Sequence, residues 1–168
     1  MDKLWAPWRI GYVTKVLRRQ KEPIFARMIK QKNDKKNYII IRFKHSFAVL
    51  NIYPYNNGHI LVVPNRKVSD LIKLTREERE DVFDLVEEVK SLLTETIKPS
   101  GFNIGINLGR PAGAGIPDHL HIHIVPRWRG DINFMPVVAN TKVISQSLDV
   151  LYKKLTDAYK RRNRRLRK

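Results

Sequence analysis

The stretch 119-HLHIHIVP-126 places three of the chain's five histidines at alternate positions in a short apolar run. Successive side chains of a strand point to opposite faces, so the spacing predicts that His119, His121 and His123 share one side. The apolar residues between and after them then point toward a core. Neighbouring imidazoles in such a row are about 6–7 Å apart, which suits nitrogens that converge on one phosphate or one metal ion.

A glycine-rich stretch, 109-GRPAGAG-115, comes just before this run. Glycine lets backbone N–H groups approach and surround an anion, and histidine titrates close to neutral pH. Two alternatives compete with a phosphate site: a strand that merely exposes three polar rings, and a zinc site built on a His-x-His pair. The glycine loop favours phosphate chemistry, because a metal site has no need of it.

Together these features resemble the histidine-triad (HIT) family of nucleotide hydrolases and transferases. The family signature, His-x-His-x-His followed by two apolar residues, matches residues 119–125. The stretch 48-AVLNIYPYNNGHILVVP-64 is similar to the family's first half, where two strands joined by a Gly-His turn hold the nucleoside. The segments 4-LWAPWR-9 and 126-PRWRGDINF-134 resemble the branch that contains diadenosine tetraphosphate phosphorylases and hydrolases. The resemblance covers roughly residues 1–155.

The resemblance implies a catalytic set of four histidines. The middle residue of the triad, His121, corresponds to the nucleophile that attacks the α-phosphorus and forms a nucleotidyl-histidine. His119 and His123 would flank it, orienting the ring and stabilising phosphate oxygens. His59 comes from the other half of the chain and would approach the same site. Positioning and charge stabilisation carry most of this kind of transfer.

The resemblance also implies five substrate-binding positions. Asn51 matches a family position that binds ribose hydroxyls, and Asn107 matches one near the scissile phosphate. The backbone N–H groups of Gly113, Ala114 and Gly115 would hold the phosphate oxygens that do not react.

We expect the protein to cleave the α-phosphate linkage of adenosine nucleotides such as diadenosine tetraphosphate, with water resolving the intermediate. An alternative is a phosphorylase of the ATP adenylyltransferase type, in which inorganic phosphate takes the place of water. Gly115 stands where many hydrolases of the family carry Gln, Ser or Thr, so the residues leave the acceptor open. A third possibility is a nucleic-acid-associated enzyme that removes adenylate from 5′ ends.

One departure from the family concerns zinc. Many relatives bind a structural zinc through a Cys-x-x-Cys pair and two histidines, but the corresponding stretch here is 23-PIFA-26, and the chain has no cysteine. His45 and His119 correspond to the two histidine ligands. Two imidazoles fall short of a closed four-ligand site. We therefore predict that the protein holds no zinc, and we expect no other cofactor.

The hydrophobic periodicity predicts an α+β fold: an antiparallel sheet, one long helix between its two halves and a C-terminal helix. A capping-box pattern at Thr75 begins the long helix. The expected elements are strands at 38–43, 47–52, 60–63 and 102–108, the triad strand, and helices to residue 97 and over 146–162. One catalytic domain (1–160) is followed by a basic tail (161–168). By resemblance, two copies form a dimer with one continuous sheet.

The formal net charge is +17, and residues 160–168 alone hold seven cations in nine positions. Such a surface attracts polyanionic substrates such as nucleotides, and it could bind nucleic acid through phosphates. The alternative is a solvated helix end whose charges suit the helix dipole. No apolar run reaches the ~20 residues that a bilayer requires, and the start lacks a signal pattern. We therefore expect a cytoplasmic protein with no membrane partner.

Overall fold

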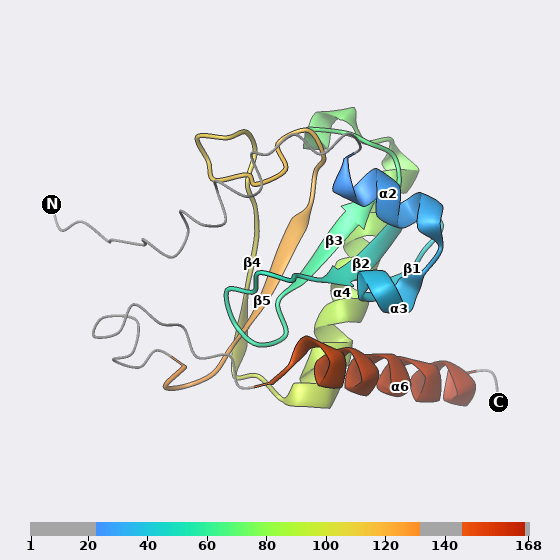
Figure 1. Cartoon of the computed structure of the whole chain (residues 1–168), viewed down its shortest axis with the longest axis vertical. Coiled ribbons are helices and arrows are strands. Elements are labelled where there is room, and N and C mark those ends of the chain that lie inside the picture. The colour runs from blue at the N-terminus through green and yellow to red at the C-terminus, as the bar shows by residue number, and fades with distance from the viewer. Residues whose placement is uncertain (1–22, 132–145, 167–168) are drawn as a thin grey trace, which may run out of the picture.

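The computed structural model describes residues 23–131 and 146–166 (Figure 1). Its five strands form one antiparallel sheet in the order β1-β2-β3-β5-β4. The strands are β1 (Ile39–Arg42), β2 (Ser46–Leu50), β3 (Ile60–Pro64), β4 (Gly101–Ile106) and β5 (Ile122–Arg127). The helices are α2 (Ile24–Gln31), α3 (Asp34–Asn37), the short 3-10 helix η1 (Leu71–Lys73), α4 (Arg76–Ile97) and α6 (Leu148–Leu166). The predicted α+β architecture is confirmed, with α4 as the long helix between β3 and β4.

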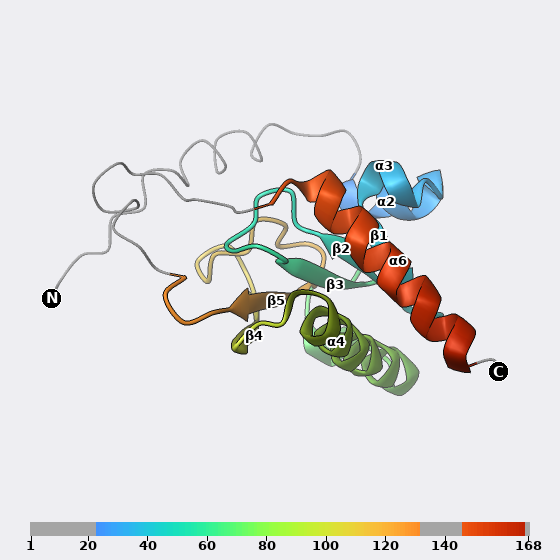
Figure 2. The same ribbon diagram turned by 90° about the horizontal axis from the view of Figure 1, so that it is seen from below.

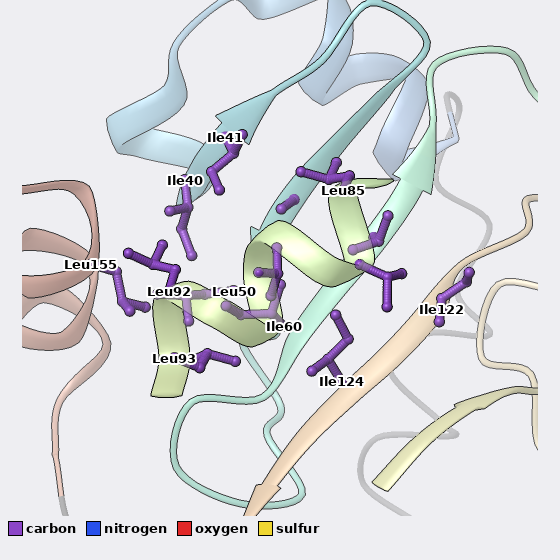
Figure 3. Close-up of a cluster of buried hydrophobic side chains, with 14 of the residues drawn as sticks. Ile40, Ile41, Leu50, Ile60, Leu85, Leu92, Leu93, Ile122, Ile124 and Leu155 are labelled. Carbon is purple, nitrogen blue, oxygen red and sulfur yellow. The ribbon is translucent and has the colours of Figure 1, made fainter. Parts of the chain in front are cut away.

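Each face of the sheet carries its own apolar cluster. On one face, strand residues pack against α4 and α6, and Figure 3 shows Leu85, Leu92 and Leu93 of α4 and Leu155 of α6 opposite strand isoleucines. On the other face, Phe25 and Met28 of α2 cover a smaller cluster from β1, β2 and β3. Figure 2 shows α2 and α4 on opposite sides of the strands. The sheet therefore separates an α4 face from an α2 face.

Helix α4 begins where the sequence predicts. The Thr75 hydroxyl accepts a hydrogen bond from the Glu78 N–H, while the Glu78 carboxylate accepts one from the Thr75 N–H at 2.9 Å. This reciprocal cap satisfies two N–H groups that would otherwise lack partners in the first turn. The helix ends at Lys98, which adopts a left-handed conformation.

The triad segment differs from the prediction of one continuous strand. β5 begins at Ile122, so among the three histidines only His123 lies within a strand. The preceding residues leave the sheet ladder, and the Leu120 N–H donates instead to the Val68 carbonyl at 2.6 Å. The prediction of three histidines in one strand is therefore wrong. His119 and Leu120 are held by carbonyls of residues 64–68, at and after the end of β3.

Two other predictions need correction. α6 continues to Leu166, beyond the predicted end at 162, so most of the predicted tail is helical. Its sequence contains neither Pro nor Gly, and its cations suit the negative end of a helix dipole. β4 ends at Ile106 rather than 108. The short helices α2 and α3 are additional to the elements predicted from the sequence.

β4 lies at one edge of the sheet. Ile104 in this strand is 47% exposed, and its neighbours in sequence are small or polar. An apolar side chain on an exposed sheet edge is unusual unless another strand covers it. Among the helices that the structure describes, none is long and apolar enough to cross a bilayer.

Candidate active site

Three imidazole rings form a contiguous group on the α2 face of the sheet. The ring centroids of His121 and His123 are 5.0 Å apart, and those of His59 and His123 are 5.1 Å apart. His123 pairs across the sheet with Leu61, which belongs to the apolar cluster of that face. The structure thus brings together histidines that are more than sixty residues apart in the chain.

The turn before β3 sets the position of His59. Gly58 has a φ of +77°, a conformation that favours glycine, and a Cβ there would lie 2.7 Å from Cδ1 of Ile97. Directly after it, the His59 carbonyl accepts a hydrogen bond from the Asn51 N–H at 2.9 Å. The Gly-His pair of the sequence therefore forms a tight turn that delivers the His59 ring, only 1% exposed, to the site.

Hydrogen-bond partners fix the direction of the His59–His123 contact. The Tyr55 N–H donates to Nδ1 of His59 at 3.0 Å, so that nitrogen is an acceptor. In neutral His59 the proton is then on Nε2, which lies 2.9 Å from Nδ1 of His123 and donates to it. By the same reasoning, neutral His123 carries its proton on Nε2. The two rings therefore donate in one direction, from His59 to His123, and leave the Nε2–H of His123 at the end of the chain.

His121 carries its proton on the other ring nitrogen, Nδ1 instead of Nε2. Its Nδ1 lies 2.8 Å from the His119 carbonyl, and since a carbonyl only accepts, Nδ1 carries the proton. Nε2 of neutral His121 is then left with its lone pair. Burial lowers the pKa of His121 below its ordinary value, which favours this neutral form. An imidazole held in this tautomer is ready to act as a nucleophile.

His119 anchors the segment rather than adding a fourth ring to this group. Its Nε2 donates to the Pro64 carbonyl at 2.9 Å, and burial is the main cause of its lowered pKa. Phe25 of α2 packs against two rings, with centroids 5.3 Å from His119 and 5.6 Å from His121. Both histidines are therefore enclosed, at 1% and 5% exposure.

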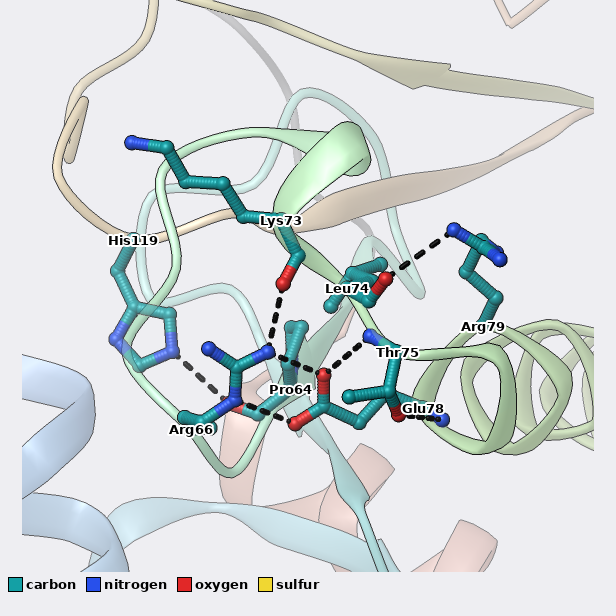
Figure 4. Close-up of polar contacts among 8 residues, drawn as sticks. All are labelled: Pro64, Arg66, Lys73, Leu74, Thr75, Glu78, Arg79 and His119. Atoms are coloured by element: carbon teal, nitrogen blue, oxygen red, sulfur yellow. Dashed lines mark hydrogen bonds and ion pairs between the residues drawn. The ribbon is translucent and has the colours of Figure 1, made fainter.

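An ion pair between Arg66 and Glu78 lies next to this anchor (Figure 4). The Arg66 guanidinium donates to both oxygens of Glu78, at 2.8 and 2.6 Å, and to the Lys73 carbonyl at 2.7 Å. The hydrogen bonds from Arg66 are the main reason that the pKa of Glu78 falls to about 2. Arg66 lies between Pro64 and Val68, whose carbonyls hold His119 and Leu120.

The glycine loop has a folded geometry of its own. The N–H groups of Gly113 and Ala114 donate to loop carbonyls at 2.9 and 3.2 Å, and the Asn107 amide contacts the Gly113 carbonyl at 3.4 Å. Within the described residues, the Gly115 N–H makes no hydrogen bond. Of the three N–H groups predicted to contact phosphate, that of Gly115 is therefore available. Those of Gly113 and Ala114 would have to exchange their present carbonyl partners for phosphate oxygens.

Asn51 and Tyr55 line the other end of the row. The Asn51 side chain contacts Nδ1 of His59 at 3.3 Å, and its oxygen accepts from the Tyr53 N–H. Tyr55 stacks on His59, with ring centroids 4.8 Å apart and planes 28° apart. Sequence reasoning missed Tyr55 and Phe25. Tyr55 lies in a turn, where no periodic pattern marks it. Phe25 lies in α2, whose buried residues Phe25 and Met28 have the spacing of a helix, so this element could have been predicted.

The residues that replace the family's zinc ligands do not fit a metal. Pro23 and Ala26 have no ligating side-chain atoms, and Nε2 of His119 donates to a carbonyl. Across residues 23–131 and 146–166, no three or more His, Cys, Asp or Glu side chains form a group that could hold a metal ion. The family's N-terminal motif, residues 4–9, lies outside the described residues.

The chain is similar in sequence to several known proteins. The HIT domain family model matches residues 31–130. A Mycobacterium tuberculosis protein named AP-4-A phosphorylase is 38% identical over 154 residues, which span 88% of this chain and 79% of that protein. A Schizosaccharomyces pombe protein named bis(5′-nucleosyl)-tetraphosphatase [asymmetrical] is 39% identical over 95 residues, or 56% of this chain and 52% of that protein.

The fold also has solved counterparts. The crystal structure of a zinc-bound histidine triad family protein from Mycobacterium smegmatis superposes with a TM-score of 0.68 at 21% identity, covering 85% of this chain and 96% of that one. At this identity the match concerns the fold alone.

Proposed function

Since the chain belongs to the histidine-triad (HIT) domain family, we propose that it cleaves the α-phosphate linkage of dinucleoside polyphosphates such as diadenosine tetraphosphate. The observation that carries the proposal is the tautomer of His121, whose Nδ1 proton is committed to the His119 carbonyl. Its Nε2 lone pair attacks the α-phosphorus. A covalent nucleotidyl-histidine forms as the bond from that phosphorus to the bridging oxygen breaks.

The neighbouring pair stabilises the leaving group. The bridging oxygen leaves with the bonding electrons as a terminal oxygen of the released nucleotide, and the Nε2–H of His123 donates a hydrogen bond to it. The Nε2–H of His59 donates across 2.9 Å to Nδ1 of His123 and holds the His123 ring in this orientation, so each ring keeps its proton. In the second half of the reaction an acceptor oxygen attacks the same phosphorus, and the His121–phosphorus bond breaks. The imidazole of His121 is then restored.

We place inorganic phosphate ahead of water as this acceptor, in contrast to the expectation from the sequence alone. The similarity to a protein named a phosphorylase extends over 88% of the chain, whereas that to the tetraphosphatase covers 56%. Gly115 offers no side chain to orient water, and a phosphate oxygen is already anionic at neutral pH. Hydrolysis remains the second candidate, supported by the tetraphosphatase relative.

Product analysis with and without inorganic phosphate tests the acceptor. Cleavage of diadenosine tetraphosphate that depends on phosphate and yields ADP supports the phosphorylase. Phosphate-independent release of AMP supports the hydrolase instead. Neither product from correctly folded protein would overturn the proposed activity.

The nucleophile is tested separately. We expect His121→Ala to abolish turnover and to prevent the appearance of a protein-bound nucleoside monophosphate in mass spectra of quenched reactions. His45→Ala is the matched control, because this histidine is remote in the sequence from the triad and its bond to Asp81 comes from the backbone N–H, which the substitution keeps. Undiminished turnover by His121→Ala would contradict the assignment.

We also propose that two copies join their sheets along β4. The strand lies at the sheet edge, and Ile104 on it is 47% exposed. Pairing with a second β4 would satisfy the edge and cover this side chain. Light scattering after size exclusion should give twice the chain mass. Ile104→Lys should shift the protein toward the monomer, while Ile72→Lys, at an exposed isoleucine remote from β4 in the sequence, should not.

A further inference from the structure

Six exposed cations line the outward side of α6. Those six are Lys153, Lys154, Lys160, Arg161, Arg164 and Arg165. Among the residues that the structure describes, none of them forms an ion pair or a side-chain hydrogen bond. We call this set the cationic stripe.

Helical geometry places the six cations on one side of α6, with Asp157 among them between Lys154 and Lys160. Residues four and seven positions apart lie on one side of a helix, and at 1.5 Å per residue the stripe is about 18 Å long. The opposite side of α6 carries Leu151, Leu155 and Ala158, all buried in the core of the α4 face. The Lys160–Arg164 and Arg161–Arg165 spacings place like charges one turn apart, which weakens a helix slightly.

The acidic residues of α4 leave the stripe unneutralised. Although α4 packs beside α6, the cation that reaches it is Arg162, which lies 3.4 Å from Glu88 and donates to Ser91 at 2.9 Å. Arg162 is only partly exposed and points inward, and so lies outside the stripe. The stripe therefore presents a net positive charge to solvent, six cations against the one carboxylate of Asp157, which lies among them.

We propose that the cationic stripe is a docking surface for the sugar–phosphate backbone of a nucleic acid, separate from the cleavage site. A row of cations about 18 Å long matches a line of phosphates better than it matches one small nucleotide. An anionic membrane fits less well. A helix that lies on a bilayer inserts its apolar side, and the apolar side of α6 is already buried in the core.

The stripe and the histidines belong to opposite faces of the sheet. The buried side of α6 packs on the α4 face, whereas His123 lies on the α2 face. A strand bound along α6 would not present its end to His121. The stripe thus localises the protein on a polyanion without making that polyanion the substrate, which disfavours adenylate removal from 5′ ends as the role of these charges.

The test compares two variants of the full chain with equal net charge. R161E/R164E/R165E reverses half of the stripe, and K44E/K90E/R129E reverses three exposed cations elsewhere. Each lowers the formal net charge of +17 by six. Fluorescence anisotropy with labelled single-stranded and duplex oligonucleotides, between about 50 and 200 mM salt, measures binding. Vesicles of phosphatidylcholine and phosphatidylserine form a second arm.

We expect the stripe variant to lose about tenfold or more in duplex affinity and to show a salt slope shallower by about 3. The control variant should lose much less. Cleavage of diadenosine tetraphosphate should be unchanged in the stripe variant, and oligonucleotides should not inhibit the wild type. Equal losses in both variants, no binding by the wild type at low salt, or preferential binding to vesicles would each overturn the proposal. The anisotropy result stands whether or not the protein cleaves dinucleotides.

Discussion

The Arg66 guanidinium donates two hydrogen bonds to the Glu78 carboxylate. This ion pair connects the start of α4 to the backbone segment that binds His119 and Leu120. The segment 64–68 contains Arg66 and supplies the carbonyls that accept from the His119 ring and the Leu120 N–H. The His119 carbonyl in turn fixes the tautomer of His121. This pair, half exposed at Arg66 and buried at Glu78, thereby acts on the nucleophile through the backbone, without touching a substrate.

We predict that Arg66→Met lowers kcat more than it raises KM, because His121 loses orientation while the binding residues stay in place. Stability should fall by about 1–2 kcal/mol, since Glu78 is left buried without its main partner. Steady-state kinetics and urea unfolding measure both effects. Arg66→Lys should recover part of kcat. Arg76→Met, which breaks the exposed Arg76–Glu80 pair, is the control and should leave kcat unchanged.

Acid should remove the stabilising effect of Glu78. Its folded-state pKa of about 2 lies below the ordinary value of 4.5, so ionised Glu78 stabilises the fold above pH 4.5. That contribution declines as the pH falls from 4.5 toward 2. The stability difference between wild type and Glu78→Gln should therefore shrink over this range in urea melts. A difference that is constant from pH 7 to the acid limit of the measurement would contradict the prediction.

The pH dependence of catalysis should reflect the buried nucleophile. Burial lowers the pKa of His121, so its Nε2 remains unprotonated below the ordinary histidine value of 6.5. We expect kcat/KM to stay level as the pH falls through 6.5 and to decline only at lower pH. A midpoint of the acidic limb above 6.5 would show that protonation of another group controls the rate.

Gly58→Ala should destabilise the protein by about 1–3 kcal/mol and reduce activity through His59. A methyl group there meets a strained backbone conformation, the Ile97 side chain at 2.7 Å and the Pro126 ring at 3.1 Å. Gly130→Ala is the matched control, because Gly130 has a similar φ of +75° with open space around it. Thermal melts of the two variants separate packing from backbone strain. Equal losses of melting temperature in the two variants would contradict the prediction that contacts with Ile97 and Pro126 add to the cost of Gly58→Ala.

Phe25→Leu should raise the pKa of His119 toward 6.5, because the smaller side chain admits water beside a ring that burial now keeps neutral. Histidine titration by NMR measures the shift. Phe83→Leu, at a position that is 54% exposed on α4, should leave the titration unchanged. An unaltered His119 titration in Phe25→Leu would indicate that other neighbours exclude water from this ring.

Much of the fold follows from local pattern. The capping box at Thr75 and the apolar stripe after it predict α4, because both signals lie within a few turns of the same helix. The apolar run 60–63, which follows a turn and ends at Pro64, likewise predicts β3. The spacing of the triad, in contrast, predicted a longer strand than the structure contains. Strand pairing depends on partners distant in sequence, and His119 and Leu120 bond instead to the carbonyls of Pro64 and Val68.

The sequence predicts which histidines form the site, but not which other residues they contact. The Gly-His turn and the triad spacing identify the histidines, and the structure places His59 beside His123. No sequence pattern indicates that Tyr55 stacks on that pair, or that Arg66 selects Glu78 from eight acidic residues on α4. Such partners are chosen by tertiary geometry, which orders side chains from separate elements. The roles of Asn51, Asn107 and the glycine loop in binding substrate stay predictions.

The division of the sheet into two faces has a practical consequence for biosensors and immobilised catalysts. A fluorophore, affinity handle or resin attached at the end of α6 would be anchored through the α4 side, with the strands between the attachment point and the reacting imidazoles. Surface coupling by this end should therefore leave the α2 face of the sheet open to dissolved reagents, whereas coupling through α2 would cover that face.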